Sequence, residues 1–245
     1  MKKITIIIPA YNEEESLPFL YERLDKLMGD MKNYDFEILF VNDGSKDKTI
    51  SIIKELREKD KRISYVDFSR NFGKEIAMIA GLDYATGDCV IFMDADLQDD
   101  INTIDEMLKD YYDGSEVVYG VRSSRANDTF FKKFTAEAFY KFMKFMGADV
   151  VFNHADYRLT SKRVLDNFAN YKEVNLFLRG MFPLIGFKSS IVYYERAERF
   201  AGESKYPLKK MLNFAWDGIT SFSVKPIRMI LDLGIFICMI SFVVL

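Results

Sequence analysis

Short apolar runs alternate with longer amphipathic stretches along the first half of the chain. Four runs rich in Ile, Val, Leu and Phe are typical of buried strands: 4–8, 36–42, 63–68 and 89–93. Between them, apolar residues recur every three or four positions and predict helices over about 14–31, 49–59 and 75–85. Alternating strands and helices favour right-handed crossovers, so the pattern predicts an α/β fold with a mainly parallel sheet flanked by helices.

The fourth apolar run, 89–93, ends abruptly in the acidic sequence D-A-D-L-Q-D-D. If the backbone stays extended for one more step, Asp94 and Asp96 point to the same side and Ala95 points away. Paired carboxylates suit a hard divalent cation, Mg²⁺ or Mn²⁺, which would also contact the phosphates of a substrate. Ligands of open α/β sheets bind outside the carboxyl ends of strands, where this pair lies. The alternative is a solvated acidic turn that begins the next helix, predicted over 101–112.

Polar residues also follow the other predicted strands, and these loops should converge on the same edge of the sheet. The first strand leads into Pro9-Ala10-Tyr11-Asn12-Glu13, the second into Asp43, and the third into 69–74. Asp43 can accept a hydrogen bond from a base or ribose, and Tyr11 can pack against a ring. The segment Asp43-Gly44-Ser45 is equally typical of an ordinary turn.

Motifs and charge exclude several binding functions. No G-x-G-x-x-G follows the first strand, and Gly73-Lys74 lacks the earlier glycine of a phosphate-binding P-loop. Residues 1–121 carry 15 Lys and Arg against 26 Asp and Glu, whereas residues 122–228 carry 19 against 10. The basic second half favours an anionic membrane surface or substrate. Nucleic acid is the second choice, and the acidic first half and the lack of a binding motif argue against it.

The second half contains two further polar motifs. A fifth strand is predicted over 116–120, and Arg122 and Arg125 follow it with two serines between them, a combination that can bind a phosphate. An exposed basic loop is the alternative. An aromatic helix predicted over 129–146 could line a lipid-facing groove or simply pack against the sheet. For His154, the chain's single histidine, a structural hydrogen bond is favoured over catalysis.

The C-terminal region becomes amphipathic and then apolar. Residues 207–228 predict amphipathic helices suited to a membrane interface, with Trp216 and several lysines. Residues 229–245 resemble the start of a transmembrane helix, but about 20 apolar residues are needed to cross a bilayer, so we expect the natural protein to continue through at least one span. The predicted organisation is therefore a catalytic domain over 1–206, juxtamembrane helices over 207–228 and a truncated span over 229–245.

The cysteine content points to a reducing compartment. Cys89 and Cys238 lie in a predicted central strand and in the apolar tail, so neither a disulfide nor a metal site is expected. The amino-terminal sequence lacks the apolar region of a signal peptide. We therefore expect a membrane protein whose catalytic domain is cytoplasmic.

Four ordered motifs in the first 100 residues resemble family 2 glycosyltransferases of the GT-A fold: I-P-A-Y-N-E-E, V-N-D-G-S-K-D-K-T, F-G-K-E-I-A-M-I-A-G-L-D-Y-A-T-G-D and M-D-A-D-L-Q-D. More narrowly, D-A-D-L-Q-D, Y-G-V-R-S-S-R, A-D-Y-R-L and G-E-S-K-Y resemble polyprenyl-phosphate glycosyltransferases. That group includes dolichol-phosphate mannose synthases and bacterial enzymes that glucosylate undecaprenyl phosphate. The resemblance extends over nearly the whole chain.

The resemblance implies a role for each matching residue. Contacts to the nucleoside of a nucleotide sugar would come from Pro9, Tyr11, Glu13 and Asp43. Contacts to the metal and diphosphate would come from Asp94, Asp96 and Gln98. The predicted catalytic residues are Asp96 and Asp156. For Gln98, whose amide is a neutral ligand, a structural hydrogen bond is the alternative.

Asp156 is the candidate general base because the resemblance places it facing the acceptor. A phosphomonoester with a second pKa of about 6 needs little deprotonation, so Asp156 could instead orient the acceptor or help to hold the metal. In the G-E-S-K-Y segment, Arg199, Ser204 and Lys205 could close over the acceptor or the donor diphosphate and exclude water. A flexible linker with incidental charges is the competing interpretation.

The predicted activity is inverting, metal-dependent transfer of a hexose from a nucleotide sugar to a polyprenyl phosphate, such as undecaprenyl phosphate, at the cytoplasmic membrane face. Inversion comes from the resemblance alone, and UDP-glucose or UDP-N-acetylglucosamine is favoured over GDP-mannose. Two alternatives remain open: a family 2 enzyme that uses a sugar hydroxyl in polysaccharide synthesis, and a non-catalytic membrane scaffold that binds nucleotide sugars. The apolar tail also allows homo-oligomers.

Overall fold

The computed structural model describes residues 2–123, 154–171, 178–197 and 224–244. The chain divides into two compact units. The first comprises 1–124, 153–172 and 185–203, and the second comprises 125–152, 173–184 and 204–245. The predicted aromatic helix over 129–146 and most of the predicted juxtamembrane helices lie outside the described residues. The first unit carries the sheet and the candidate site.

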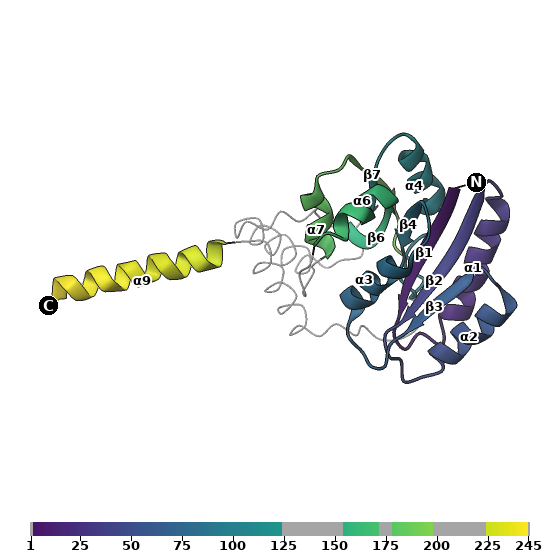
Figure 1. Cartoon of the computed structure of the whole chain (residues 1–245), viewed down its shortest axis with the longest axis horizontal. Helices are drawn as coiled ribbons and strands as arrows, with labels where there is room; N and C mark the ends of the chain where they lie inside the picture. Colours follow the sequence, from purple (N-terminus) through teal and green to yellow (C-terminus); the bar gives the residue numbers. More distant parts are fainter. Residues whose placement is uncertain (1, 124–153, 172–177, 198–223, 245) are drawn as a thin grey trace. The chain divides into compact units, whose positions relative to one another are not determined.

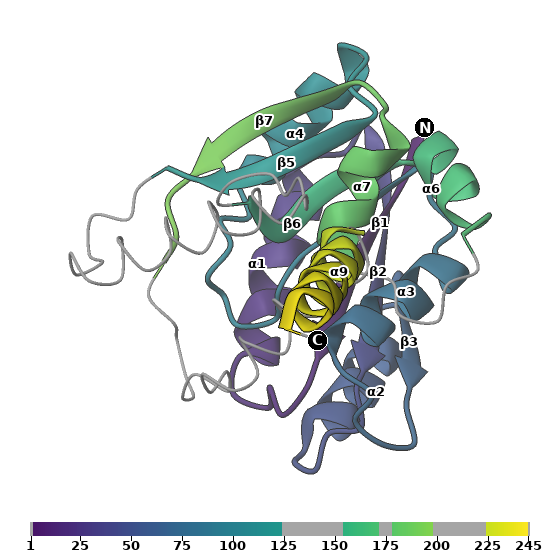
Figure 2. The same ribbon diagram turned by 90° about the vertical axis from the view of Figure 1, so that its left-hand side faces the viewer.

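A seven-stranded sheet forms the centre of the first unit, in the order β3-β2-β1-β4-β6-β5-β7 (Figures 1 and 2). Its strands are β1 (Lys2–Ala10), β2 (Tyr34–Asn42), β3 (Ile63–Asp67), β4 (Cys89–Phe92), β5 (Val117–Arg122), β6 (His154–Ser161) and β7 (Ser189–Tyr194). Strand β6 runs antiparallel to both neighbours, and the other adjacent pairs are parallel. The predicted mainly parallel α/β sheet is confirmed.

Helices cover both faces of this sheet (Figure 1). They are α1 (Leu17–Asp30), α2 (Thr49–Lys59), α3 (Lys74–Tyr84) and α4 (Thr103–Tyr112), with the short α6 (Lys162–Phe168) after β6. The core on one face joins Ile4, Ile6 and Ile8 of β1 to the apolar residues of α1, α2 and α4. Helix α3 covers the opposite face, where a Cβ on Gly81 would lie 2.5 Å from Cγ2 of Ile7. Side chains therefore alternate along β1 between two buried faces, as the continuous apolar run predicts.

The structure differs from the sequence-based expectation at two places near the site. Strand β6 was not predicted, because its sequence H-A-D-Y-R-L-T-S includes two charged residues, Asp156 and Arg158, that are nevertheless buried. Strand β4 ends at Phe92, and the chain turns at Ala95 instead of staying extended through the acidic motif. The simple alternation expected for the acids therefore does not apply.

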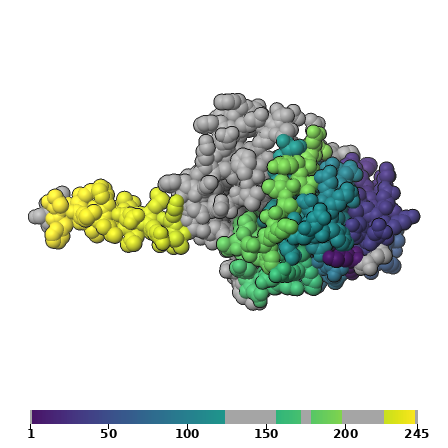
Figure 3. All heavy atoms as spheres, turned by 90° about the horizontal axis from the view of Figure 1, so that it is seen from above, coloured from purple at the N-terminus to yellow at the C-terminus, as the bar shows by residue number. Residues whose placement is uncertain are grey.

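The second unit contributes two described helices, α7 (Leu178–Ile185), whose last residue belongs to the first unit, and α9 (Lys225–Val244). By length and composition α9 could cross a membrane: its span Lys225–Val243 has a mean hydropathy of 2.0, and its apolar side chains are exposed along its length (Figure 3). The predicted start of a transmembrane segment at residue 229 falls within this helix.

Gly44 allows the turn after β2 to lie directly against the loop after β3. Its φ is +64°, and an added Cβ would lie 2.2 Å from the carbonyl carbon of Arg70. We expect Gly44→Ala to destabilise the fold by about 1–3 kcal/mol, because the backbone of the loop must move and the φ angle is strained. Thermal unfolding followed by circular dichroism measures this. Gly29→Ala, within α1 and with nothing within 4 Å, is the control and should not destabilise. Equal melting temperatures for the two variants would contradict this packing.

Candidate active site

The antiparallel strand β6 brings two distant acids to the same edge of the sheet. In the register of β4 and β6, Phe92 at the end of β4 pairs with Arg158, and Asp94 and Asp156 both contact the side chain of Lys74 just beyond this pair. Because β6 is antiparallel, its amino end meets the carboxyl ends of β1, β2 and β4. The edge of the sheet where the strand ends were predicted to meet therefore also carries Asp156, which lies outside the first 100 residues.

A lysine connects these two acids. Nζ of Lys74, the first residue of α3, lies 2.5 Å from Oδ1 of Asp94 and 2.7 Å from Oδ2 of Asp156. Burial lowers the pKa of Lys74, but the charges and hydrogen bonds of Asp156 and Asp94 outweigh burial, and the pKa is raised. The charged ammonium of Lys74 thus lies between Asp156 of β6 and Asp94 of the segment 94–100, which we call the acidic turn.

A second cation lies behind Asp156. The side chain of Arg158 is fully buried, and its NH2 group is 3.8 Å from Oδ1 of Asp156. The guanidinium carbon lies 5.4 Å from the centre of the Phe92 ring, in a cation–π contact. The Asp156 carboxylate, 5% exposed, is therefore flanked by Lys74 on one oxygen and Arg158 on the other.

Buried hydrogen bonds hold the acidic turn to two strands. One oxygen of Asp99 accepts from the backbone N–H of Asp94 at 3.1 Å, and the other accepts from the hydroxyl of Tyr194 on β7 at 2.8 Å. Burial, with a contribution from the charge of Asp94, raises the pKa of Asp99 to about 7. On β6, the hydroxyl of Tyr157 donates to the carbonyl of Asp100 at 2.9 Å. Asp99 is thus a supporting residue that positions Asp94.

The other two predicted metal ligands lie further along this turn. Asp96 is buried, and one of its oxygens accepts from the backbone N–H of Gln98 at 3.2 Å. The Gln98 amide donates to the carbonyl of Ala197 at 3.3 Å and accepts from the guanidinium of Arg196. These contacts match the structural role considered for Gln98, whereas its role as a metal ligand stays a prediction.

Two arginines lie beside this part of the turn. Arg122 ends β5 and pairs in register with Tyr194 of β7. Burial lowers the pKa of Arg196, and the neighbouring charge of Arg122 lowers it further. Of the three predicted phosphate-binding arginines, Arg122 is therefore near the acidic turn, together with Arg196, which the sequence analysis did not select.

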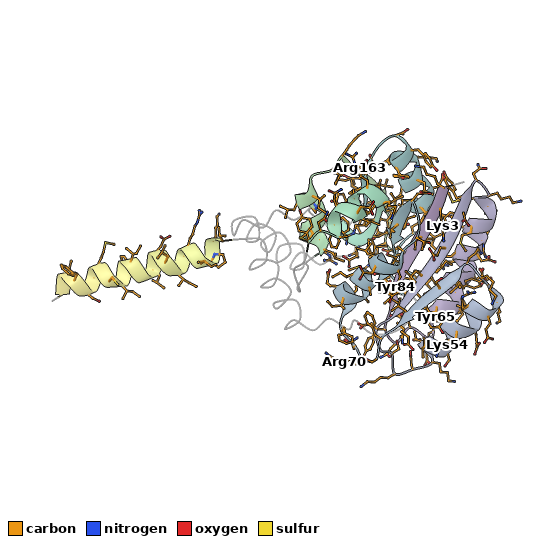
Figure 4. The ribbon with its side chains drawn as sticks, in the orientation of Figure 1. Lys3, Lys54, Tyr65, Arg70, Tyr84 and Arg163 are labelled. Carbon is orange, nitrogen blue, oxygen red and sulfur yellow. The ribbon has the colours of Figure 1, made fainter. Side chains whose placement is uncertain are left out.

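Asp43 organises the loop that leads to Lys74. Its carboxylate accepts hydrogen bonds from the backbone N–H groups of Phe72, at 2.7 Å, and Gly73, at 3.0 Å, and from the Asn71 side chain at 2.8 Å. Burial raises the pKa of Asp43, and the two backbone donors act in the opposite direction. Arg70 stacks on the Phe72 ring, 4.2 Å from its centre, at the outer side of this loop (Figure 4).

The remaining nucleoside-binding candidates lie at the end of β1. Pro9 is within the strand, and Tyr11 and Glu13 follow it half-buried. Glu13 accepts from the hydroxyl of Ser16 at 2.8 Å, and its own backbone N–H donates to Thr49 at 2.8 Å. Their contacts to a nucleoside, and that of Asp43, stay predictions. Four predicted phosphate-binding residues lie outside the described part of the chain: Arg125, Arg199, Ser204 and Lys205.

Sequence analysis missed Lys74, although it placed the loop 69–74 at this edge of the sheet. Its position directly after Gly73 was considered only as part of a P-loop, and that motif is incomplete. A useful signal was the position of Lys74 at the first turn of a helix that follows a strand end, where its side chain can reach the neighbouring acids. Arg196 lies beyond the last strand and had no comparable signal.

The donor set fits a divalent cation. Among the described residues no group of three His, Cys, Asp or Glu side chains could hold a metal ion by itself. The turn after β4 offers the carboxylates of Asp94 and Asp96, and the Gln98 amide beside them is hydrogen-bonded to Arg196 and Ala197. This is the usual protein contribution to a Mg²⁺ site that is completed by substrate phosphates and water. The Asp94 carboxylate already holds the ammonium of Lys74, so it faces a position that a cation can take. Asp94, Asp96 and Gln98 could therefore hold Mg²⁺ or Mn²⁺ together with a diphosphate.

Comparisons with known proteins identify the family of the chain and agree with its fold. The family model described as glycosyl transferase family 2 matches residues 5–169. An uncharacterized glycosyltransferase of Bacillus subtilis is 48% identical over 97% of this chain and 73% of its own length. A bactoprenol glucosyl transferase of Shigella phage SfV is 43% identical over 98% of this chain and 78% of its own. Among solved structures, glucosyl-3-phosphoglycerate synthase from Mycobacterium tuberculosis has a TM-score of 0.55 at 18% identity and covers 88% of this chain and 76% of that one.

Proposed function

This chain belongs to glycosyl transferase family 2, and from that premise we propose that it transfers a hexose from a nucleotide sugar to a polyprenyl phosphate. The observation that carries the proposal is the 43% identity, over 98% of the chain, to a protein named bactoprenol glucosyl transferase. Bactoprenol is a polyprenol, which makes undecaprenyl phosphate the proposed acceptor and UDP-glucose the first donor to test, followed by UDP-N-acetylglucosamine.

The donor is bound at the strand ends of the first unit. Its nucleoside contacts Pro9, Tyr11, Glu13 and Asp43, and its diphosphate lies at the acidic turn. Asp94, Asp96 and Gln98 would hold a divalent cation there, with Asp99 fixing the position of Asp94. A bound Mg²⁺ or Mn²⁺ supplies positive charge that offsets the charge developing on the leaving diphosphate.

The acceptor phosphate makes the new bond. One of its oxygens attacks the anomeric carbon on the side opposite the diphosphate, and the bond from that carbon to the diphosphate oxygen breaks, with the electron pair leaving on the diphosphate. This displacement inverts the anomeric configuration. Because a phosphomonoester is largely ionised above pH 6 or so, no proton has to be removed. Asp156 therefore orients the acceptor side of the site and need not act as a general base.

The acceptor reaches the site from a membrane. In this proposal residues 1–206 form the catalytic domain, 207–228 lie at the membrane interface and α9 belongs to the membrane-spanning part, with the catalytic domain at the cytoplasmic face. The apolar exposed surface of α9 supports this arrangement. Arg122, Arg125, Arg199, Ser204 and Lys205 are proposed to bind phosphate groups of the donor or the lipid.

The test is transfer by the purified full chain from a panel of labelled nucleotide sugars: UDP-glucose, UDP-N-acetylglucosamine and GDP-mannose. Each is offered undecaprenyl phosphate, undecaprenol without phosphate, or an oligosaccharide. The proposal expects label in the lipid fraction with undecaprenyl phosphate only. Transfer to the oligosaccharide alone would instead establish a hydroxyl acceptor, and nucleotide binding without transfer to any acceptor would establish a scaffold.

A further inference from the structure

Lys74 occupies the point where the donor and acceptor sides of the site meet. Its ammonium contacts Asp94 of the acidic turn and Asp156 of β6 at 2.5 and 2.7 Å, and its side chain is 29% exposed. The loop before it is fixed by the hydrogen bonds of Asp43 to Phe72 and Gly73. No step of the proposed transfer uses this residue.

An anionic acceptor creates an electrostatic problem at this site. The phosphate must approach a carbon attached to a diphosphate, past the carboxylates of Asp94, Asp96 and Asp156. Like charges this close repel strongly inside a protein, where the effective dielectric constant is far below that of water. A cation bound at the acidic turn offsets the diphosphate, which leaves the acceptor and Asp156 to be offset by another positive group.

The position of Lys74 suits this task better than those of the described arginines nearby. Arg158 is fully buried behind Asp156 and has no exposed surface for a ligand. Arg122 and Arg196 lie beside Gln98 and Tyr194, at the β5 and β7 side of the turn. Lys74 is partly exposed, and its ammonium carries three donors, so it can keep its bond to Asp156 while donating to a phosphate oxygen.

We propose that Lys74 binds the phosphate of the acceptor, keeping Asp156 as its anchor and giving up Asp94 when a divalent cation occupies the acidic turn. The inference rests on the proposed function, since it needs an anionic acceptor. The inference also gives Asp156 a role in a reaction that requires no base. Asp156 holds Lys74 in place on the acceptor side of the site.

Steady-state kinetics with Lys74→Met test the binding role. We expect the KM for undecaprenyl phosphate to rise about 10- to 100-fold, as for the loss of a hydrogen bond to a charged group, while the KM for the nucleotide sugar changes less than about threefold. Lys74→Gln should behave like Lys74→Met and provides a second neutral variant if the first unfolds. Lys109→Met, which removes an exposed lysine paired with Asp105, is the matched control and should leave both constants unchanged.

Mn²⁺ binding without substrates gives an independent result, measured by electron paramagnetic resonance. Because the ammonium competes for Asp94, Lys74→Met should bind Mn²⁺ about tenfold more tightly than the wild type, and Lys109→Met should not. Unchanged or weaker Mn²⁺ binding by both neutral variants would overturn the competition at Asp94.

The outcomes separate this inference from the proposed function. If the wild type transfers sugar to undecaprenyl phosphate but the neutral variants keep its lipid KM, the inference fails and the function stands. If instead the variants lose affinity for UDP in the presence of Mn²⁺, with an unchanged lipid KM, Lys74 is a donor ligand and the inference is again wrong. Failure of the wild type with every lipid phosphate would overturn the function itself, and the inference with it.

Discussion

Replacing Asp94 and Asp96 together by Ala is expected to lower kcat for transfer to undecaprenyl phosphate by about 10³-fold or more. The two carboxylates lie on one turn after β4, and Asp94 is positioned by the buried Asp99. Their removal takes away the carboxylate ligands proposed for the divalent cation, so the diphosphate would leave with its charge poorly compensated. Losing a single preorganised group that stabilises developing charge costs about 10²–10³ in kcat in other enzymes, and here the whole site is lost.

The expected loss is chemical, not structural. The side chain of Asp94 is 30% exposed, and Lys74 has a second contact, with Asp156, that the substitution does not remove. The double variant should therefore still unfold cooperatively, with a melting temperature lowered only by the loss of the hydrogen bond from the Gln98 backbone to the buried Asp96, as judged by circular dichroism. Asp105→Ala, on the exposed side of α4, is the matched control and should retain full transfer. A double variant that transfers sugar at the wild-type rate is incompatible with the proposed site.

Asp156→Asn is expected to have a large effect on stability and a smaller one on catalysis. The substitution leaves the fully buried guanidinium of Arg158 without the carboxylate 3.8 Å away, and removal of one partner of a buried ion pair costs about 3–5 kcal/mol. Turnover with undecaprenyl phosphate should fall by less than about a hundredfold, because an ionised phosphate needs no base. A true general base would contribute about 10²–10⁴-fold.

Two measurements check this prediction: thermal unfolding and kcat at saturating lipid phosphate, both on the full chain. Asp166→Asn, an exposed partner of Lys162 on α6, should change neither. A loss of turnover beyond a thousandfold in a variant that is still folded would show that Asp156 removes a proton. That result would favour a sugar hydroxyl as the acceptor.

The first half of the fold could be predicted because its strands are continuous apolar runs. β1 and β4 are buried on both faces, so nearly every residue carries the signal, and the amphipathic helices between them have clear periodicity. The acidic turn was found for the same reason: charged residues directly after a buried strand stand out. The parallel arrangement then placed the other strand ends at the same edge.

Strand β6, which carries the other half of the site, could not be predicted from its sequence. Asp156 and Arg158 are charged yet buried, and each is accommodated by the other and by Lys74 or Phe92, residues more than 60 positions away. Such compensation depends on tertiary contacts and leaves no periodic pattern. The motif A-D-Y-R-L was recognised only through the family resemblance, and the contact between Lys74 and Asp156 had no counterpart in the sequence.

Metal removal from the wild-type full chain tests the central claim most directly. The protein is stripped with EDTA, freed of the chelator, and assayed for transfer of labelled glucose from UDP-glucose to undecaprenyl phosphate while Mg²⁺ or Mn²⁺ is titrated back. We expect transfer to fall by at least about 10³-fold without metal and to return as the cation is added. Undiminished transfer by the metal-free protein would contradict a cation held by Asp94 and Asp96.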